Sequence, residues 1–386
     1  MKQKLLKLLP YAMVAAISAA LTLLCALPVA PNNDSKLEEL ENLILEKFIG
    51  EADLNAMEDA AAEAMVSSLG DRWSYYMSAE TYQVYREQMA NSYVGIGVTI
   101  QQREDAQGLD VIAVTKGGSA EAAGIAVGDI IVAVDGQSIS GVSTSEVRTL
   151  IRGQEGTQVV ISVLRDGKNL DFTVVRAQIE TPVATAMLLE GNIGLVTIEN
   201  FDSRCAEETL AALKELLAQG AEKLIFDVRN NPGGYQKELV KVLDYLLPEG
   251  LLFRSEYYNG KVSEDYSDAA CVDVPMAVLI NGNSYSAAEF FAAALSEYDK
   301  AVLVGQATSG KGYFQSAFEL SDGSAVNLSI GKYYTPKGAN LAGVGLTPDV
   351  AVEVSDEIAA QIYAGTLVPM EDPQILAAIA ALEKTK

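Results

Sequence analysis

The chain of 386 residues predicts an α/β protein in which a helical segment and a β-rich segment precede the core. Three changes of pattern indicate this. Apolar residues recur with helical spacing from residue 31 to about 90, short β runs broken by glycine turns follow to residue 177, and strands alternate with helices after that. With 49% hydrophobic residues, the chain can bury substantial cores in two or three domains.

The N-terminus has the pattern of a secretion or anchoring signal. Three lysines lie within the first seven residues, and an uncharged apolar segment runs from Tyr11 to Ala30. Because Pro31 disfavours cleavage after Ala30, we expect residues 1–30 to be an uncleaved signal anchor in the cell membrane, with the remainder outside the cytoplasm. Cleavage and secretion are the alternative.

Composition excludes several kinds of chemistry. The chain contains no histidine, so a Ser-His-Asp triad, a Cys-His pair and a His-ligated zinc site are impossible. Three cysteines are too few for an all-cysteine zinc site, and we expect no metal and no cofactor. A net charge of −24 argues against a nucleic-acid partner. Only Cys205 and Cys271 could pair, and no pattern shows that they do.

The helical segment, residues 31–91, is too short to form a core alone, so we expect it to pack on the rest of the chain or on a partner subunit. Residues 70–77 indicate a turn. The first expected helix has an apolar stripe formed by Leu37, Leu40, Ile44 and Phe48; the next two are Leu54–Leu69 and Ala79–Met89.

The β-rich segment, residues 92–177, resembles a PDZ domain of the bacterial, circularly permuted kind. Its expected elements are strands opening at Gly95 and at Val111–Val114, helix Ser119–Ala123, strand Ile130–Val134, helix Thr144–Ile151 and the hairpin Val159–Leu164/Leu170–Val175. PDZ domains bind an extended peptide at a sheet edge and capture its C-terminal carboxylate with backbone N–H groups. The resemblance implies that Gly95, Ile96 and Gly97 form this loop; alternatively, the glycines only start a strand.

The α/β segment, residues 178–352, places glycines and serines where strands end. The expected elements are strand Ile193–Ile198, helix Cys205–Leu217, strand Lys223–Val228, helix Gln236–Leu247, strand Met276–Ile280, helix Phe290–Leu295 and strand Ala301–Val304. Ligands bind at the carboxyl ends of such strands, where Gly233-Gly234 could offer a backbone N–H or merely form a turn. Ser284 or Ser286 lies near a helix start, where free N–H groups favour the negative charge that develops when a nucleophile reacts. A serine at such a position is more often only an N-cap.

Two interpretations compete for Lys311. Residues Gly305–Lys311 match a P-loop up to its last position, where Gly312 replaces the required Ser or Thr. The following residues alternate like a strand, which disfavours nucleotide binding. The second interpretation is a Ser/Lys dyad, which requires a buried lysine of lowered pKa. Tyr313, Phe314 and the strands at 276–280 and 301–304 could bury the amine, and Gln315 could orient it from the same strand face.

The ordered motifs resemble the C-terminal processing peptidases, the tail-specific serine proteases of family S41. The likeness runs from about residue 35 to 352. The matching stretches are DVRNNPGG at 227–234, NGNSYSAAE at 281–289, GKGYFQ at 310–315, GLTPD at 345–349 and GDRWSYY at 70–76. The resemblance implies a ClpP/crotonase-like α/β core followed by a C-terminal helical tail, residues 353–386, with helices at Asp356–Tyr363 and Pro373–Lys384.

By matched position, the resemblance implies that Ser286 is the nucleophile, Lys311 the general base and Gln315 the residue that orients the lysine. The family spacing of 25 residues selects Ser286 over Ser284. The N–H groups of Ala287 and of a glycine in the NPGG stretch, Gly233, would hold the oxyanion. Two positions depart from the family, namely Tyr285 in place of alanine and Ala288 in place of serine. Neither departure removes a catalytic atom, but the family does not define the shape of the substrate pocket at Tyr285.

The sequence therefore predicts a membrane-anchored serine endopeptidase that binds the C-termini of extracytoplasmic proteins through its PDZ domain. We expect ligand capture at the PDZ loop to regulate access to the serine, and the terminal helical segments to pair two subunits in a homodimer. The alternatives are a catalytically inactive, membrane-tethered PDZ adaptor and, with less support, an acidic secreted structural protein.

Overall fold

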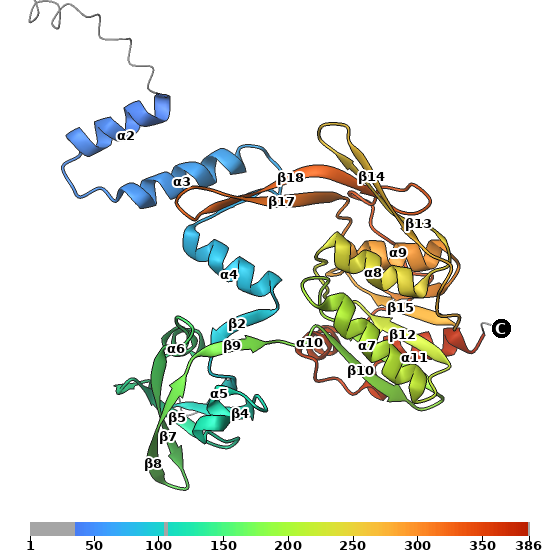
Figure 1. The fold of residues 1–386 in the computed structure, drawn as a ribbon, viewed down its shortest axis with the longest axis horizontal. Coiled ribbons are helices and arrows are strands. Elements are labelled where there is room, and N and C mark those ends of the chain that lie inside the picture. Colours follow the sequence, from blue (N-terminus) through green and yellow to red (C-terminus); the bar gives the residue numbers. More distant parts are fainter. Residues whose placement is uncertain (1–34, 104–106, 385–386) are drawn as a thin grey trace, which may run out of the picture. The chain divides into compact units, whose positions relative to one another are not determined.

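The computed structural model describes residues 35–103 and 107–384, and its contacts divide the chain into a unit ending at Ala64 and a unit beginning at Met65 (Figure 1). The first unit contains α2 (Lys36–Lys47) and most of α3 (Leu54–Ser67). Among the described residues, no helix is both long and apolar enough to span a bilayer. The predicted signal anchor, residues 1–30, lies outside them.

Helix α2 begins with a reciprocal cap. The Ser35 side chain accepts the Glu38 N–H, and the Glu38 carboxylate accepts the Ser35 N–H. Leu37, Leu40 and Ile44 of the predicted apolar stripe lie on this helix, and Phe48 is its C-cap residue. No residue of α2 is buried, and Leu40 and Phe48 are 51% and 58% exposed. This unit therefore has apolar side chains that nothing within the unit covers.

The β-rich segment folds as predicted, around an antiparallel sheet ordered β3-β4-β5-β7-β8. Its strands are β3 (Val98–Gln102), β4 (Leu109–Val114), β5 (Ile130–Val134), β7 (Gln158–Arg165) and β8 (Lys168–Val175), with β6 (Gln137–Ser138) beside β5; its helices are α5 (Ser119–Ala123) and α6 (Thr144–Ile151). Ile131, Ile161 and Val163 form the fully buried centre. Strand β3 lies at an edge of the sheet. The strands β2 (Ser92–Gly95) and β9 (Ala177–Glu180) pair with each other in a separate antiparallel sheet. Through them the chain enters and leaves this segment.

The α/β segment contains a six-stranded sheet ordered β10-β11-β12-β15-β16-β19, in which β10 is antiparallel and the other strands are parallel. Alternate residues of β15 face opposite sides of the sheet. Met276 and Val278 pack under α7 (Cys205–Ala218), α8 (Gln236–Leu246) and α9 (Ala287–Glu297), while Ala277 packs against α11 (Pro373–Leu382). The strands are β10 (Ala184–Leu189), β11 (Ile193–Ile198), β12 (Lys223–Asp227), β15 (Met276–Ile280), β16 (Ala301–Gly305) and β19 (Val350–Ala351). The helices are α7, α8, α9, α10 (Asp356–Ala364) and α11.

A second sheet contains β1 (Tyr75–Met77), β18 (Ala325–Tyr334), β13 (Gly250–Tyr257) and β14 (Val262–Ser267), with β17 (Tyr313–Glu319) also paired to β18. Helix α4 (Ala79–Met89) follows β1, as predicted. The turn predicted for 70–77 is wrong in its last part, because Tyr75 pairs with Asn327. Local periodicity contains no information on a partner so distant in the chain. Cys205 and Cys271 are both free thiols.

Candidate active site

Four successive parallel strands deliver one polar group each to the same edge of the sheet. Asp202 follows β11, Gly233 follows β12, Ser286 follows β15 and Lys311 follows β16. All four line a single cavity of about 310 Å³, together with Gln315. Because parallel strands direct their carboxyl ends to one edge, residues far apart in the sequence meet there.

Ser286 has an unusual backbone conformation, which a helix-capping residue does not need. Its φ is 58° and its ψ is −124°. The serines that cap α2, α6 and α10, namely Ser35, Ser143 and Ser355, have φ between −62° and −68° and ψ between 152° and 159°. A non-glycine residue in such a sparsely populated region costs roughly 1–3 kcal/mol. A strained strand-to-helix turn is one way in which proteins present a nucleophile.

The other candidate serine, Ser284, is fully buried and its hydroxyl group is already engaged. Its Oγ donates to the Val228 carbonyl at 2.7 Å and accepts the Asn281 N–H at 3.0 Å. Ser284 thus joins the loops after β12 and β15. Ser286, in contrast, is 6% exposed and lines the cavity.

The amine of Lys311 lies between two aromatic rings. Its Nζ is 4.5 Å from the Trp73 ring centre and 5.6 Å from that of Tyr285. Burial lowers the pKa of Lys311 to about 8, although the Glu289 carboxylate opposes this shift. The rings predicted to bury the amine lie elsewhere: Phe314 stacks on Tyr333 at 4.8 Å, and Tyr313 is 38% exposed.

The three predicted catalytic side chains share the cavity without a hydrogen bond between any two of them in the described structure. Gln315 Nε2 donates instead to Ser329 Oγ at 3.0 Å and to the Tyr313 carbonyl at 3.2 Å. The sequence argument for Gln315 assumed one regular strand, but Lys311 precedes β17 and the β17–β18 pairing shifts register between Phe314 and Gln315. The orienting role of Gln315 therefore stays a prediction.

Glu289 is a residue whose role sequence reasoning missed. Its buried carboxylate accepts four hydrogen bonds, with Oε2 taking the N–H groups of Ser286 and Lys311 at 3.0 and 2.8 Å. Its Oε1 takes the Gly310 N–H at 2.8 Å and the Thr308 hydroxyl at 2.5 Å. Glu289 therefore ties the serine turn to the lysine loop. The Ser-x-x-Glu spacing, typical of a capping box, was the available signal.

We expect Glu289→Gln to lower kcat by about 100-fold, because the serine and lysine backbones lose their shared anchor. The Glu289 carboxylate raises the pKa of Lys311, so its loss should lower that pKa. The pH at which the remaining activity is half-maximal should therefore move below 8. Thr308→Val is the matched control, because it keeps the Glu289 carboxylate and three of its four donors, although it also removes the acceptor of the Leu346 N–H. A pH–rate profile of Glu289→Gln with an unshifted midpoint would contradict this role.

The glycine loop after β12 approaches the serine turn closely. A Cβ added to Gly233 would lie 2.8 Å from both Ser286 Cβ and the Ala287 nitrogen. The φ of Gly233 is 94°, so both the close approach and the backbone conformation require glycine. The predicted oxyanion donors differ in availability. Gly233 N–H donates to Asn231 Oδ1 at 2.8 Å, whereas no described residue accepts the N–H of Ala287 or Gly234. Gly233 would serve only after Asn231 releases it.

The predicted PDZ loop lines a second cavity, of about 220 Å³, beside the edge strand β3. Its lining includes Gly95, Ile96 and Gly97, together with Arg148 from α6 and Arg152 from the C-terminal end of that helix. In the described chain, no residue accepts the N–H of Ile96 or Gly97. Sequence reasoning missed the two arginines, although their spacing of four residues placed them on one helix face.

Comparison with known proteins agrees with this architecture. The sequence profile of peptidase family S41 matches residues 192–352, and that of the PDZ domain matches residues 111–165. The carboxy-terminal processing protease CtpA of Bacillus subtilis (strain 168) is 33% identical over 333 residues, which is 85% of this chain and 71% of that protein. A Staphylococcus aureus (strain COL) protein called "Probable CtpA-like serine protease" is 32% identical, over 83% of this chain and 65% of its own.

The solved structure of a protein described as "Putative S41 protease", from Bacteroides fragilis NCTC 9343, has the same fold. It matches with a TM-score of 0.53 at 18% identity and covers 84% of this chain and 90% of its own. The predicted α/β fold with a PDZ domain is thereby confirmed. The chain belongs to peptidase family S41. Within that family it falls in the class of serine-type carboxy-terminal processing peptidases.

Proposed function

We propose that this protein cleaves extracytoplasmic protein substrates with a Ser286/Lys311 dyad. One observation carries the proposal: a serine in a strained turn and a buried lysine with a pKa lowered to about 8 line one cavity. A neutral amine can accept the serine proton, which replaces the histidine that the chain lacks.

In the proposed reaction, Lys311 Nζ takes the proton of Ser286 Oγ while the oxygen attacks the scissile carbonyl carbon. The N–H of Ala287 donates to the resulting oxyanion, with a glycine N–H of the loop after β12 as second donor. Protonated Lys311 then gives its proton to the leaving amine, and water hydrolyses the acyl-enzyme. The amine must first leave the space between Trp73 and Tyr285, which binds its charged form by cation–π contacts.

The pH dependence of cleavage tests this proposal. Below the lysine pKa, each unit of pH lowers the neutral fraction about tenfold. We therefore expect kcat/KM for an unstructured peptide to rise with pH and to level off above about 8, the pKa of Lys311. A profile that is flat between pH 6 and 9 would exclude Lys311 as the base.

The inactive PDZ adaptor is the second candidate function, because no Ser286–Lys311 hydrogen bond occurs among the described residues. The two functions differ in the same assay. An adaptor would bind the peptide and leave it intact at every pH.

We also propose that the PDZ domain takes the C-terminal segment of a substrate as an additional strand on β3. The free N–H groups of Ile96 and Gly97 would bind the terminal carboxylate, and Arg148 and Arg152 would add positive charge. Capture there would regulate access to Ser286. A peptide with a free C-terminus should therefore bind more tightly than its amidated twin.

A membrane-anchored homodimer outside the cytoplasm completes the proposal. The uncharged segment from Tyr11 to Ala30 supports the anchor, and the exposed apolar stripe on α2 supports pairing of subunits. Sedimentation of the detergent-solubilised full chain tests the dimer, and a monomer at micromolar concentration would exclude it. Protease treatment of intact cells tests the orientation.

A further inference from the structure

Asp202 is a buried acid without a partner. Six acidic side chains are buried among the described residues, and Asp202 is 7% exposed. Five of the six meet a cation or a hydrogen-bond donor: Asp129, Asp227, Glu238, Glu289 and Asp372. In contrast, Asp202 Oδ1 is fully buried and accepts no hydrogen bond, and no described residue donates to Oδ2. An acid with a purely structural role would be paired like the others.

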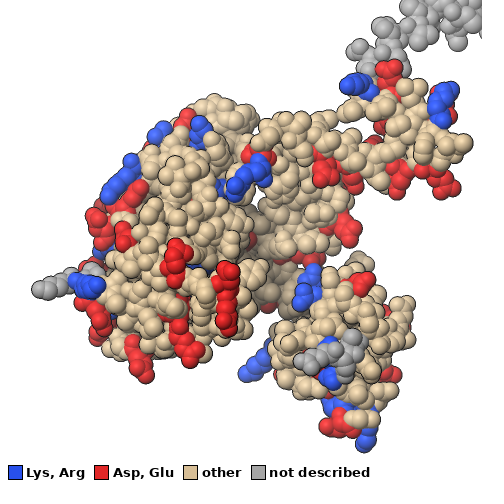
Figure 2. All heavy atoms as spheres, turned by 180° about the vertical axis from the view of Figure 1, so that it is seen from behind, with Lys and Arg blue, Asp and Glu red and all other residues tan. Residues whose placement is uncertain are grey.

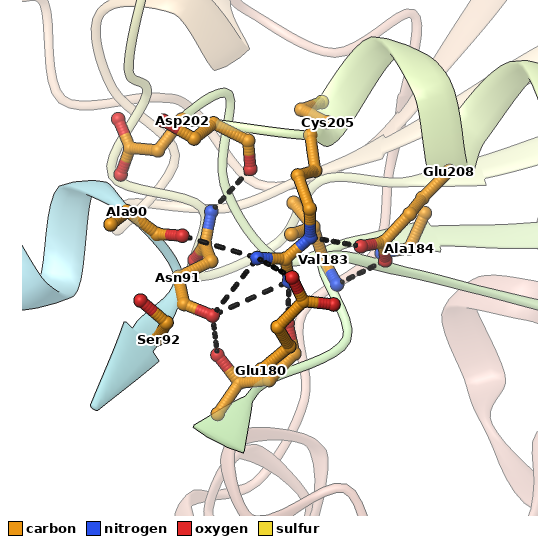
Figure 3. Close-up of polar contacts among 12 residues, drawn as sticks. Ala90, Asn91, Ser92, Glu180, Val183, Ala184, Asp202, Cys205 and Glu208 are labelled. Carbon is orange, nitrogen blue, oxygen red and sulfur yellow. Dashed lines mark hydrogen bonds and ion pairs between the residues drawn. The ribbon is translucent and has the colours of Figure 1, made fainter. Parts of the chain in front are cut away.

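The backbone holds Asp202 in this position. Its N–H donates to Asn200 Oδ1 at 2.9 Å, and the Phe201 N–H donates to the Gly233 carbonyl at 2.7 Å. On the other side of the loop, Arg204 binds the carbonyls of Asn91 and Thr181. Figure 3 shows the Asp202 carboxylate turned away from this cluster, with no dashed line reaching it. The carboxylate therefore makes no ion pair with Arg204, the arginine of its own loop.

Asp202 lines the same cavity as Ser286. A Cβ on Gly234 would lie 2.6 Å from Asp202 Oδ1, so the acid lies against the glycine loop that contacts Ser286. Tyrosine rings form the neighbouring walls. Burial raises the pKa of Tyr85, Tyr235 and Tyr285, and the charge of Asp202 raises each further. Burial also raises the pKa of Asp202 itself, to about 7. A cationic partner would lower this pKa again, because a nearby positive charge favours the ionised carboxylate.

We propose that Asp202 is the charged end of a substrate subsite beside Ser286 that receives a lysine or arginine side chain flanking the scissile bond. The aliphatic stem of such a side chain would pack on the tyrosine rings, and its cation would meet both the rings and the unpaired carboxylate. A cavity of about 310 Å³ lies within the range of small-ligand sites. The inference rests on the proposed peptidase function.

The surface charge favours the same substrates. The chain has a net charge of −24, and acidic side chains predominate on the face drawn in Figure 2. Such a field attracts basic protein segments from solution and repels acidic ones, and salt weakens the effect. Basic protein segments would therefore be attracted by the net negative charge at long range and bound by the Asp202 carboxylate at short range.

Cleavage of matched peptides tests the subsite. The peptides differ only by lysine, norleucine or glutamate on either side of the scissile bond. We expect wild-type kcat/KM to favour lysine over norleucine, which has the same four-carbon stem without the ammonium group, by about 10- to 100-fold, the range for a charge-assisted contact. Asp202→Asn should bring this ratio near one. The matched control Glu207→Gln, which removes an exposed acid from the first turn of α7, should leave the ratio unchanged. A wild-type ratio near one would overturn the proposal.

A binding measurement separates the subsite from the chemistry. Trp73 is the only tryptophan of the chain and lines the same cavity, so its fluorescence reports occupancy. Propylguanidinium should change this fluorescence saturably in the wild type but not in Asp202→Asn, and neutral propylurea should have no effect in either. If propylguanidinium binds in this way but no peptide is cleaved, the subsite stands and the proposed function fails. If peptides are cleaved without a lysine preference and the two probes act alike, the function stands and the subsite fails.

Discussion

Replacing Ser286 with alanine is expected to lower the rate of peptide cleavage by about 10³- to 10⁶-fold, the usual loss when a nucleophile that acts with a base is removed. Only the Oγ atom is deleted, and the turn keeps its hydrogen bond from the Ser286 N–H to Glu289. Folding and peptide binding by the PDZ domain should therefore persist. Single-turnover cleavage followed by mass spectrometry measures the rate, and fluorescence anisotropy with free and amidated peptides measures the binding.

Ser284→Ala is the matched control for this substitution. The Ser284 hydroxyl donates to the Val228 carbonyl and does not act on substrate in the proposed mechanism. We expect it to reduce the free energy of unfolding by about 1–3 kcal/mol, because a buried carbonyl loses its donor. Cleavage should survive in the folded fraction. Retained cleavage in Ser286→Ala, or a greater loss in Ser284→Ala, would exclude Ser286 as the nucleophile.

Lys311→Arg is expected to be as inactive as Ser286→Ala. Arginine keeps the positive charge and the contacts with the rings of Trp73 and Tyr285, but its guanidinium cannot be deprotonated to serve as a base. The expected loss in kcat/KM is again at least about 10³-fold. Unchanged far-UV circular dichroism and an unchanged Tm would show that the loss is chemical.

Lys311→Met separates chemistry from stability. Burial penalises the charged amine, as its lowered pKa shows, so a neutral side chain of similar length should stabilise the fold while abolishing cleavage. We expect the free energy of unfolding to rise by about 1 kcal/mol at pH 7. If Lys311→Arg kept more than a tenth of wild-type activity, the dyad would have to be replaced by another base.

Local patterns in the sequence were sufficient for most of the fold. Strand Met276–Ile280 and helix Thr144–Ile151 occur where periodicity placed them. Hydrophobic spacing and helix caps involve residues within a turn or two of each other, so a short stretch of chain contains the whole signal. The absence of histidine left lysine among the few possible bases, the strand-like alternation after Gly312 disfavoured a P-loop, and the family spacing selected Ser286. The domain boundaries stay predictions.

The surroundings of that pair depended on the tertiary structure. Trp73 lies beside Lys311 because Tyr75–Met77 pairs with β18, a contact between segments about 250 residues apart. Asp202 reaches the same cavity because four parallel strands end at one edge of the sheet. Such contacts depend on closing long loops and burying shared surface, which no local pattern encodes. The sequence by itself determined most elements and, through the family's motifs, the candidate pair. The tertiary structure decided what surrounds the lysine amine, which serine is strained, and which acid of the cavity is left unpaired.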